Sequence, residues 1–387
     1  MNNTSGAFKK VFFVWAVLLS AAVLAQAPAV DMPLVNRNCE AALQKNNLAD
    51  ANRDCRQAVL LATQNAGVPS DQARAMDNWS ALQLAQGQTA EAEAALRRGL
   101  AVREKASGPN SADIALSMDQ LAALQSRAGK FDDAKASLNR SLLIRQSLYG
   151  PQRKEAAVSL SAMGVLAINQ RKGAEAEALL RQSLAIREKV LTPKDPLVGR
   201  TLSNLAVAVR LGNSGGKGDA TAEPIFRQAL RLQEAAVGPD DLSLADTVEQ
   251  LARLTGELGK AQESESLWRR SIAVREKRLG TEHLTLSVAL NELGLGYVGA
   301  KSLGQADTVF RRALAIRQKA LGVNDLQVAE VASNLGAVLF TQGKVSEALP
   351  LMQHAAAVTQ VVLGPEHPTS KTRWANLQRV MKAAPGP

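Results

Sequence analysis

Few side chains in this sequence belong to the types that carry out chemistry. The 387 residues include two cysteines and three histidines. His354 has no Cys or His at ligand spacing, while His283 and His367 occur at one phase of a repeated pattern, so no metal site is predicted. No Ser-His-Asp or Cys-His arrangement stands apart from that pattern. We therefore expect no enzyme activity, no metal and no cofactor.

One segment has the composition of a phosphate-binding loop. It begins at Gly212 and reads Gly-Asn-Ser-Gly-Gly-Lys-Gly. Its first Gly lies four residues before Gly216 instead of five, and Gly218 stands where Ser or Thr would bind magnesium. The segment also follows a predicted helix instead of a strand. We interpret it as a widened turn.

The two cysteines leave two interpretations open. Cys39 and Cys55 are the only thiols in the chain. In an oxidising compartment such a pair persists as a disulfide. Elsewhere the two residues would be small buried hydrophobic side chains on helices.

The N-terminus indicates export. Lys9 and Lys10 precede an apolar stretch, 11–25, interrupted only by Ser20, which is typical of a secretory signal peptide. The stretch is short for a membrane span of ~20 residues. We expect a signal peptide over 1–25, cleaved after Ala25, and a periplasmic or secreted protein. The alternative is an uncleaved N-terminal segment that anchors the chain in a membrane.

The composition narrows the fold class. Hydrophobic residues make up 46% of the chain but aromatic residues only 3%. Disordered, collagen-like and disulfide-dense chains are excluded by these values. The interior must instead be built from aliphatic side chains.

A six-residue motif recurs along the chain. It is Leu-Ala-Ile-Arg-Glu-Lys at Leu184, and close variants begin at Leu100, Ile272 and Leu314. The anchor residues of all units are Leu100, Leu142, Leu184, Leu230, Ile272, Leu314 and Ala356. They are 42 residues apart except for one interval of 46, whose excess lies in the Gly-rich segment. A fixed period of this length indicates one array of stacked repeats instead of separate domains.

Columns of equivalent residues surround these anchors. Small side chains lie eight residues before them, large apolar side chains four residues before them, and Gly eight residues after six of the seven. These spacings place both side-chain columns on one face of a helix, which the Gly closes in the left-handed conformation. A further apolar column upstream indicates a preceding helix. Each unit is therefore predicted to be a helical hairpin that must stack on its neighbours.

These columns, with a Gly in the turn between the helices, resemble the tetratricopeptide repeat. The 42-residue period resembles its kinesin-light-chain-like subgroup, and the resemblance covers Asp71 to Lys382. It implies an all-α fold, a right-handed α-solenoid of stacked antiparallel helical hairpins. We divide the chain into the signal peptide (1–25), a linker (26–35), a degenerate N-terminal hairpin (36–67), seven repeats (71–364), a capping helix (365–382) and a tail (383–387).

Both cysteines fall within the predicted degenerate hairpin. It would carry Cys39 on its first helix and Cys55 on its second, in facing positions. A disulfide between them would staple the exposed end of the solenoid.

The resemblance also implies where a partner would bind. In this family the first helices line a concave groove, where Asn side chains hold an extended peptide, since a carboxamide both donates and accepts hydrogen bonds. The groove candidates are Asn78, Gln120, Asn204, Gln250, Asn334 and Asn376, together with Arg74, Arg127, Arg200, Arg210 and Arg253. Acidic side chains are expected on the same side, so the groove would be mixed in sign; they are Asp77, Asp119, Asp246, Glu249 and Glu330. An ordinary solvated helix residue is the alternative for each Asn.

The excess positive charge suggests a second use of the surface. The formal net charge is +10 at pH 7, and the excess lies on the second helices, including Arg97, Arg98, Arg269, Arg270, Arg311 and Arg312. This basic convex face would suit anionic lipid or polysaccharide in an envelope-associated structural protein, although such stripes are usually solvated. We expect mainly a non-enzymatic scaffold with a protein or peptide partner and no nucleic acid. Membrane contact would be limited to the basic face or an uncleaved N-terminus.

Overall fold

A computed structural model describes residues 31–45, 47–192, 194–213 and 217–383. The predicted signal peptide (1–25) and the tail beyond Ala383 lie outside the described residues, as does the middle of the Gly-rich segment. The chain divides into two compact units, residues 1–162 and 163–387, and each is treated separately below.

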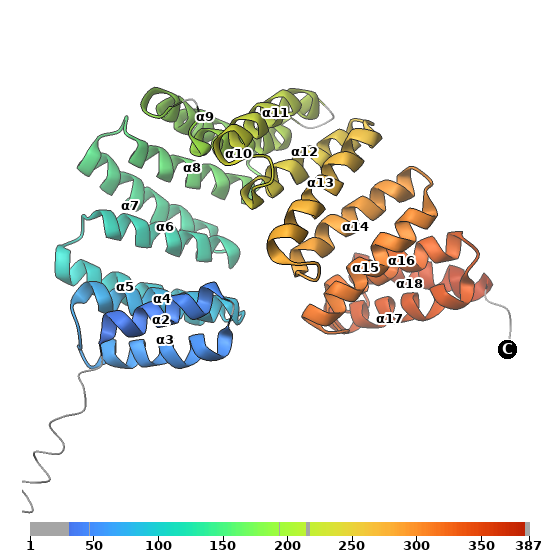
Figure 1. Ribbon diagram of the computed structural model, residues 1–387, viewed down its shortest axis with the longest axis horizontal. Helices are drawn as coiled ribbons and strands as arrows, with labels where there is room; N and C mark the ends of the chain where they lie inside the picture. The colour runs from blue at the N-terminus through green and yellow to red at the C-terminus, as the bar shows by residue number, and fades with distance from the viewer. Residues whose placement is uncertain (1–30, 46, 193, 214–216, 384–387) are drawn as a thin grey trace, which may run out of the picture. The chain divides into compact units, whose positions relative to one another are not determined.

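The first unit is a stack of antiparallel helices (Figure 1). Its helices are α2 (Met32–Gln44), α3 (Leu48–Thr63), α4 (Pro69–Ala85), α5 (Thr89–Ser107), α6 (Ala112–Arg127), α7 (Phe131–Tyr149) and the beginning of α8 (Lys154–Asn169). From α2 to α7 consecutive helices pack against each other, and α2 also packs against α4, the first helix of the next hairpin.

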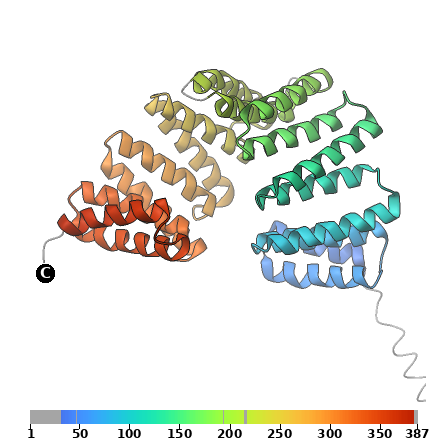
Figure 2. The same cartoon turned by 180° about the vertical axis from the view of Figure 1, so that it is seen from behind.

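The second unit continues the same pattern from the end of α8, and Figure 2 shows its helices from the other side. Its helices are α9 (Gly173–Val190), α10 (Pro196–Gly212), α11 (Lys217–Val237), α12 (Ala245–Glu257), α13 (Ala261–Leu279), α14 (Leu284–Gly299), α15 (Leu303–Leu321), α16 (Leu326–Thr341), α17 (Val345–Leu363) and α18 (Pro368–Ala383). A short 3₁₀ turn, η1 (Leu242–Leu244), precedes α12. The predicted all-α solenoid of helical hairpins is confirmed: the described residues form helices, turns and loops.

Local sequence signals explain where the helices begin and end. Asp195 and Asp325 cap α10 and α16 by accepting a hydrogen bond from the backbone N–H two residues later. His283 does the same for α14, so it serves as a helix cap. At the other end, the predicted column of closing glycines has φ between 75 and 95°, a conformation that favours Gly. Thr192 breaks that column, and α9 accordingly ends at an extended Leu191.

In the hairpins α14–α15 and α16–α17, glycines of the first helix face the large apolar column of the second helix, so the two helices approach closely. In α14 a Cβ added to Gly294 would lie 2.6 Å from the Phe310 ring, and in α16 one added to Gly336 would lie 2.7 Å from Met352. Phe310 is completely buried. Gly is therefore required by packing at these two positions, because a side chain there would collide with its partner.

The N-terminal hairpin differs from the expectation at its start. Helix α2 begins at Met32, so residues 32–35 are helical and do not belong to a linker. Asp31 provides the extended N-cap and Pro33 stands within the first two helical positions, where a missing N–H costs nothing. Two further residues hold this hairpin to the next: Asn36 donates to the Asp71 carbonyl at 3.0 Å and its own carbonyl accepts from Asn78.

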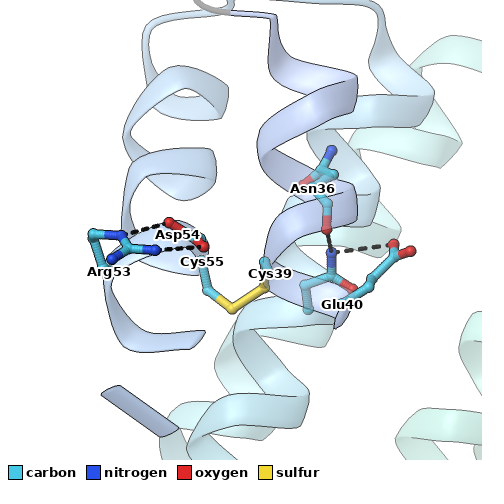
Figure 3. The surroundings of a disulfide bond; sticks show 7 residues. Asn36, Cys39, Glu40, Arg53, Asp54 and Cys55 are labelled. Carbon is cyan, nitrogen blue, oxygen red and sulfur yellow. Dashed lines mark hydrogen bonds and ion pairs between the residues drawn. A yellow bond between two sulfur atoms is a disulfide. The ribbon is translucent and has the colours of Figure 1, made fainter. Parts of the chain in front are cut away.

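The cysteines form the predicted bridge between α2 and α3 (Figure 3). The Cα atoms of Cys39 and Cys55 are 5.0 Å apart, and both side chains are completely buried. They pack with Leu82 of α4 and the small residues of the first hairpin. The disulfide interpretation is thus confirmed over the alternative of two separate buried thiols.

Candidate functional site

A column of arginines from the second helices reaches between neighbouring helices. Its members are Arg103, Arg145, Arg187, Arg275 and Arg317, each three residues after an anchor. All except Arg103 are buried, and Arg103 is only 17% exposed at its side chain. Buried guanidinium groups need charged or hydrogen-bonding partners, and the partners define which surface charges remain free.

Four of these arginines form ion pairs with the acidic residues that were predicted to lie in the groove. Arg103 pairs with Asp77, and Arg145 with Asp119 at 2.6 Å. The remaining pairs are Arg275 with Glu249 at 2.8 Å and with Asp246 at 3.1 Å, and Arg317 with Glu330 at 2.8 Å. These five carboxylates thus bind the chain's own arginines, although the side chains of Asp246 and Glu330 remain 92% and 49% exposed.

Arg187 is different, because a carbonyl and a hydroxyl take the place of a carboxylate. Its Nη1 donates to the Leu197 carbonyl at 3.0 Å and to the Thr201 hydroxyl, while its Nε is buried without a hydrogen-bond partner. Burial lowers the pKa of this guanidinium, and the positive charge of Arg200 lowers it further. At the position thirteen residues after Arg317 there is the carboxylate of Glu330, whereas the same position after Arg187 holds Arg200.

In the first unit, the predicted groove residues do not form one open surface. Asn78 is buried, and its amide donates to the Asn36 carbonyl and to Glu40, both at 3.3 Å. It therefore holds α4 against α2 instead of facing a ligand. Gln120 and Arg127 are exposed on α6, and Arg74 is exposed 4.0 Å from Glu40.

In the second unit, equivalent positions of successive first helices form a continuous exposed or half-exposed surface, which we call the first-helix face. It consists of Arg200, Asn204 and Val207 on α10, Asp246, Gln250 and Arg253 on α12, Val288, Glu292 and Leu295 on α14, and Glu330, Asn334 and Ala337 on α16. The predicted Asn204, Gln250 and Asn334 lie on this face, and Asn376 is half-buried on α18.

The predicted arginines of this unit differ in how firmly they are held. Arg210 forms ion pairs with Asp219 at 2.8 Å and with Glu257. It therefore links α10 to its neighbouring helices. Arg253 lies 3.6 Å from Glu292. Arg200 is exposed. Of the three, Arg200 is therefore the cation most open to a ligand.

The arginines of the predicted basic face are mostly neutralised. Arg97 pairs with Glu93, Arg269 with Glu265, Arg270 with Glu234, Arg311 with Asp307 and Glu347, and Arg312 with Glu276, at distances between 2.5 and 2.8 Å. Only Arg98 of the six is exposed without such a pair among the described residues. These pairs run along and between the second helices, and they leave little free positive charge for an anionic surface.

A pocket opens on the first-helix face between α14 and α16. It has a volume of about 440 Å³ and is lined by Leu295, Val298, Lys301, Leu303, Phe310, Asn334, Ala337, Val338 and Thr341. We call it the Asn334 pocket. The amide of Asn334 donates to Oδ1 of Asn291 at 3.0 Å, which fixes the orientation of the side chain. Leu295 and Val298 are 44% and 39% exposed, so the wall offers apolar surface to a ligand.

Lys301 stands at the edge of this pocket in an unusual backbone conformation. Its φ is 59°, at the turn position where Gly87, Gly129, Gly259 and Gly343 stand in other repeats. A non-Gly residue in this region is uncommon and is costly for most side chains. Lys301 is exposed, and among the described residues no carboxylate is placed within ion-pair distance of it. The pocket therefore combines apolar walls, a carboxamide and a cation at its edge.

Sequence reasoning found Asn334 but missed the apolar wall beside it. It considered the polar column alone, although Val288, Leu295 and Val298 recur at helical spacing on the exposed side of α14. Within the described ranges, no three potential metal ligands gather at one place. None of the helices described there combines the length and the apolar character that a bilayer crossing requires.

Comparison with known proteins gives matches to two family models, both described as tetratricopeptide repeat. One matches residues 71–147 and 244–319, and the other 156–197 and 328–369. Together they cover more than half of the chain. No curated protein matches the sequence.

Solved structures with similar folds were also found. BtubC (BKLC) from P. vanneervenii is 22% identical, with a TM-score of 0.52, over 60% of this chain and 92% of that one. The apo form of the quorum sensor NprR from B. thuringiensis is 13% identical, with a TM-score of 0.60, over 91% of this chain and 94% of that one. NprR in complex with its cognate peptide NprX gives 13% identity and a TM-score of 0.52, over 97% and 94% of the two chains.

Proposed function

Since the chain belongs to the tetratricopeptide repeat family, we propose that it is a non-enzymatic scaffold that captures an extended peptide of a partner protein. The proposed binding surface is the first-helix face of the second unit. A repeat array suits this task, because successive helices present equivalent positions along a line that an extended chain can follow.

The observation that carries this proposal is the Asn334 pocket. Its volume of about 440 Å³ lies in the range of ligand sites, and its apolar walls with a single fixed carboxamide match the usual composition of such sites. An apolar side chain of the peptide would enter the pocket, while Asn334 would bond its backbone. NprR, a protein of similar fold, is solved with a bound peptide, which supports this type of ligand.

Lys301 indicates the charge of the preferred peptide. Four other repeats use Gly at this turn, so a Lys held at a φ of 59° is a departure with an energetic cost. Lys301 lines the pocket and has no carboxylate partner among the described residues. Arg200 adds a second exposed cation to the same face. We expect a peptide that carries an acidic residue next to its apolar anchor.

The proposed location is the periplasm or the outside of the cell. The N-terminal pattern over 1–25 is that of a signal peptide, and the Cys39–Cys55 disulfide is of the kind that persists in oxidising compartments. Both observations support an exported scaffold.

A peptide selection tests the binding function. The full chain would be used to select peptides from a random displayed library, and the affinity of the best peptide would be measured by calorimetry. Asn334→Ala should weaken it about tenfold, corresponding to one lost hydrogen bond of about 1.4 kcal/mol. Asn139→Ala is the matched control, because Asn139 is exposed on the second helix α7. Equal affinities of the two variants would contradict the proposed site.

A further inference from the structure

A second cavity adjoins α14 on the side of α12 and α13. It has a volume of about 520 Å³ and is lined by Gly256, Ala261, Gln262, Ser264, Glu265, Trp268, Leu293, Leu295, Gly296, Tyr297, Gly299 and Ala300. We call it the Gly296 pocket. Leu295 lines both this cavity and the Asn334 pocket, so the two are neighbours within the second unit.

The cavity exists because a core side chain is missing. The residues equivalent to Gly296 in the other repeats are Leu82, Leu124, Leu166, Ala208, Leu254, Val338 and Val380, and all seven are buried. Apart from its chain neighbours and the backbone of its own helix, a Cβ added to Gly296 would have no heavy atom within 4 Å. The glycine is exposed. Helix α14 thus leaves open a space that a side chain fills elsewhere.

Comparison with Gly294 in the same helix shows that packing does not require Gly at position 296. A Cβ on Gly294 would collide with the Phe310 ring at 2.6 Å, so that position demands Gly. Gly296 and Gly299 meet no such obstacle. Helix-interior Gly is unfavourable by roughly 1 kcal/mol relative to Ala. A residue that is intrinsically unfavourable and relieves no collision points to a use for the empty space.

The walls of the Gly296 pocket are mostly apolar, with Gln262, Ser264 and Glu265 as their polar members. Trp268 and Tyr297 are both 4% exposed and contribute their rings, with Leu293 and Leu295 beside them. The one ionised wall residue, Glu265, pairs with Arg269 at 2.8 Å and accepts a hydrogen bond from the Tyr297 hydroxyl at 3.1 Å. An occupant is therefore selected mainly by shape and apolar area.

We propose that the Gly296 pocket receives an uncharged apolar side chain of the bound peptide, of leucine size or larger, which takes the place of the missing core residue. This inference rests on the proposed peptide binding and adds a second anchor to it. Because Leu295 separates the two pockets, one extended peptide would insert two apolar side chains, one on each side of α14.

Filling the cavity from within tests the inference. Gly296→Leu places in the pocket the residue that four other repeats carry there. The matched control is Gly304→Leu, because Gly304 lies on α15, lines neither pocket and has equally open surroundings. Both variants gain helix propensity, but only Gly296→Leu buries its new side chain. We expect its Tm to exceed that of the control by about 4 °C.

Two ligands would then be titrated into the full chain and both variants. Isobutylbenzene, followed by NMR, reports on the cavity alone, and the selected peptide reports on its use. We expect Gly296→Leu to lose isobutylbenzene binding and at least tenfold in peptide affinity, while Gly304→Leu keeps both. Unchanged isobutylbenzene binding, or a lowered Tm, would show that the cavity is not the one described.

The titration with the selected peptide distinguishes failure of this inference from failure of the proposed function. Unchanged peptide affinity in Gly296→Leu, with isobutylbenzene binding lost, would overturn the second anchor and leave the Asn334 pocket standing. In Asn334→Ala, isobutylbenzene binding should be retained while the peptide affinity falls about tenfold, as expected for two adjacent pockets.

Discussion

The disulfide at the N-terminal end should control the stability of the first hairpin. Cys39 and Cys55 are separated by 16 residues, and closing a loop of this length removes unfolded-state entropy worth about 3 kcal/mol. Both side chains are completely buried between α2, α3 and α4. Replacing both with Ala keeps the apolar surroundings but deletes the cross-link. The paired substitution should therefore lower the local stability of α2 and α3 by about 3 kcal/mol.

Hydrogen exchange measures this effect locally. Amides of α2 and α3 should exchange about a hundredfold faster in the Cys39→Ala, Cys55→Ala variant, since 1.4 kcal/mol corresponds to a factor of ten. Amides of α15 and α16 serve as the internal reference and should exchange as before. Treatment of the unaltered chain with a reductant in mild denaturant should reproduce the variant. Equal protection of α2 and α3 with and without the bridge would refute the reasoning.

Four further outcomes follow from the structure. Arg145→Met should destabilise the protein by about 3 kcal/mol in urea unfolding, because it leaves the Asp119 carboxylate without its guanidinium. The same change at Arg187 should stay within about 1 kcal/mol, since no carboxylate is left behind and an unpartnered buried Nε is removed; equal losses would contradict this distinction. Lys301→Gly should raise stability by about 1 kcal/mol while weakening acidic peptides more than neutral ones, and an unchanged preference would remove Lys301 from the site. The exported chain should begin at Gln26 by intact-mass measurement, whereas a mass that retains residues 1–25 would indicate an uncleaved anchor.

The helical architecture could be predicted because its determinants are local. Small, large-apolar and Gly columns repeat at fixed offsets from each anchor, and each has a direct conformational consequence within one hairpin. The resemblance to the tetratricopeptide repeat is confirmed. The disulfide followed from the same logic, since two facing helices brought Cys39 and Cys55 together.

The surface could not be predicted to the same extent, because it depends on side-chain pairing between helices distant in sequence. Asn78 satisfied the pattern of a ligand-binding amide, yet the packing of α4 against α2 brings Asn36 and Glu40 onto it. The acidic residues of the first helices were visible in the sequence, but their pairing with the buried arginine column was not. Cavities are harder still. Gly296 is conspicuous only once its column is known to be buried in every other repeat.

The central claim is that a peptide binds along the first-helix face at α14 and α16. Hydrogen exchange of the full chain, with and without the selected peptide, tests it most directly. We expect slowed exchange concentrated in residues 284–341, with the strongest protection in the C-terminal halves of α14 and α16, where the Asn334 pocket lies. Protection confined to the second helices, or to the first unit, would contradict it.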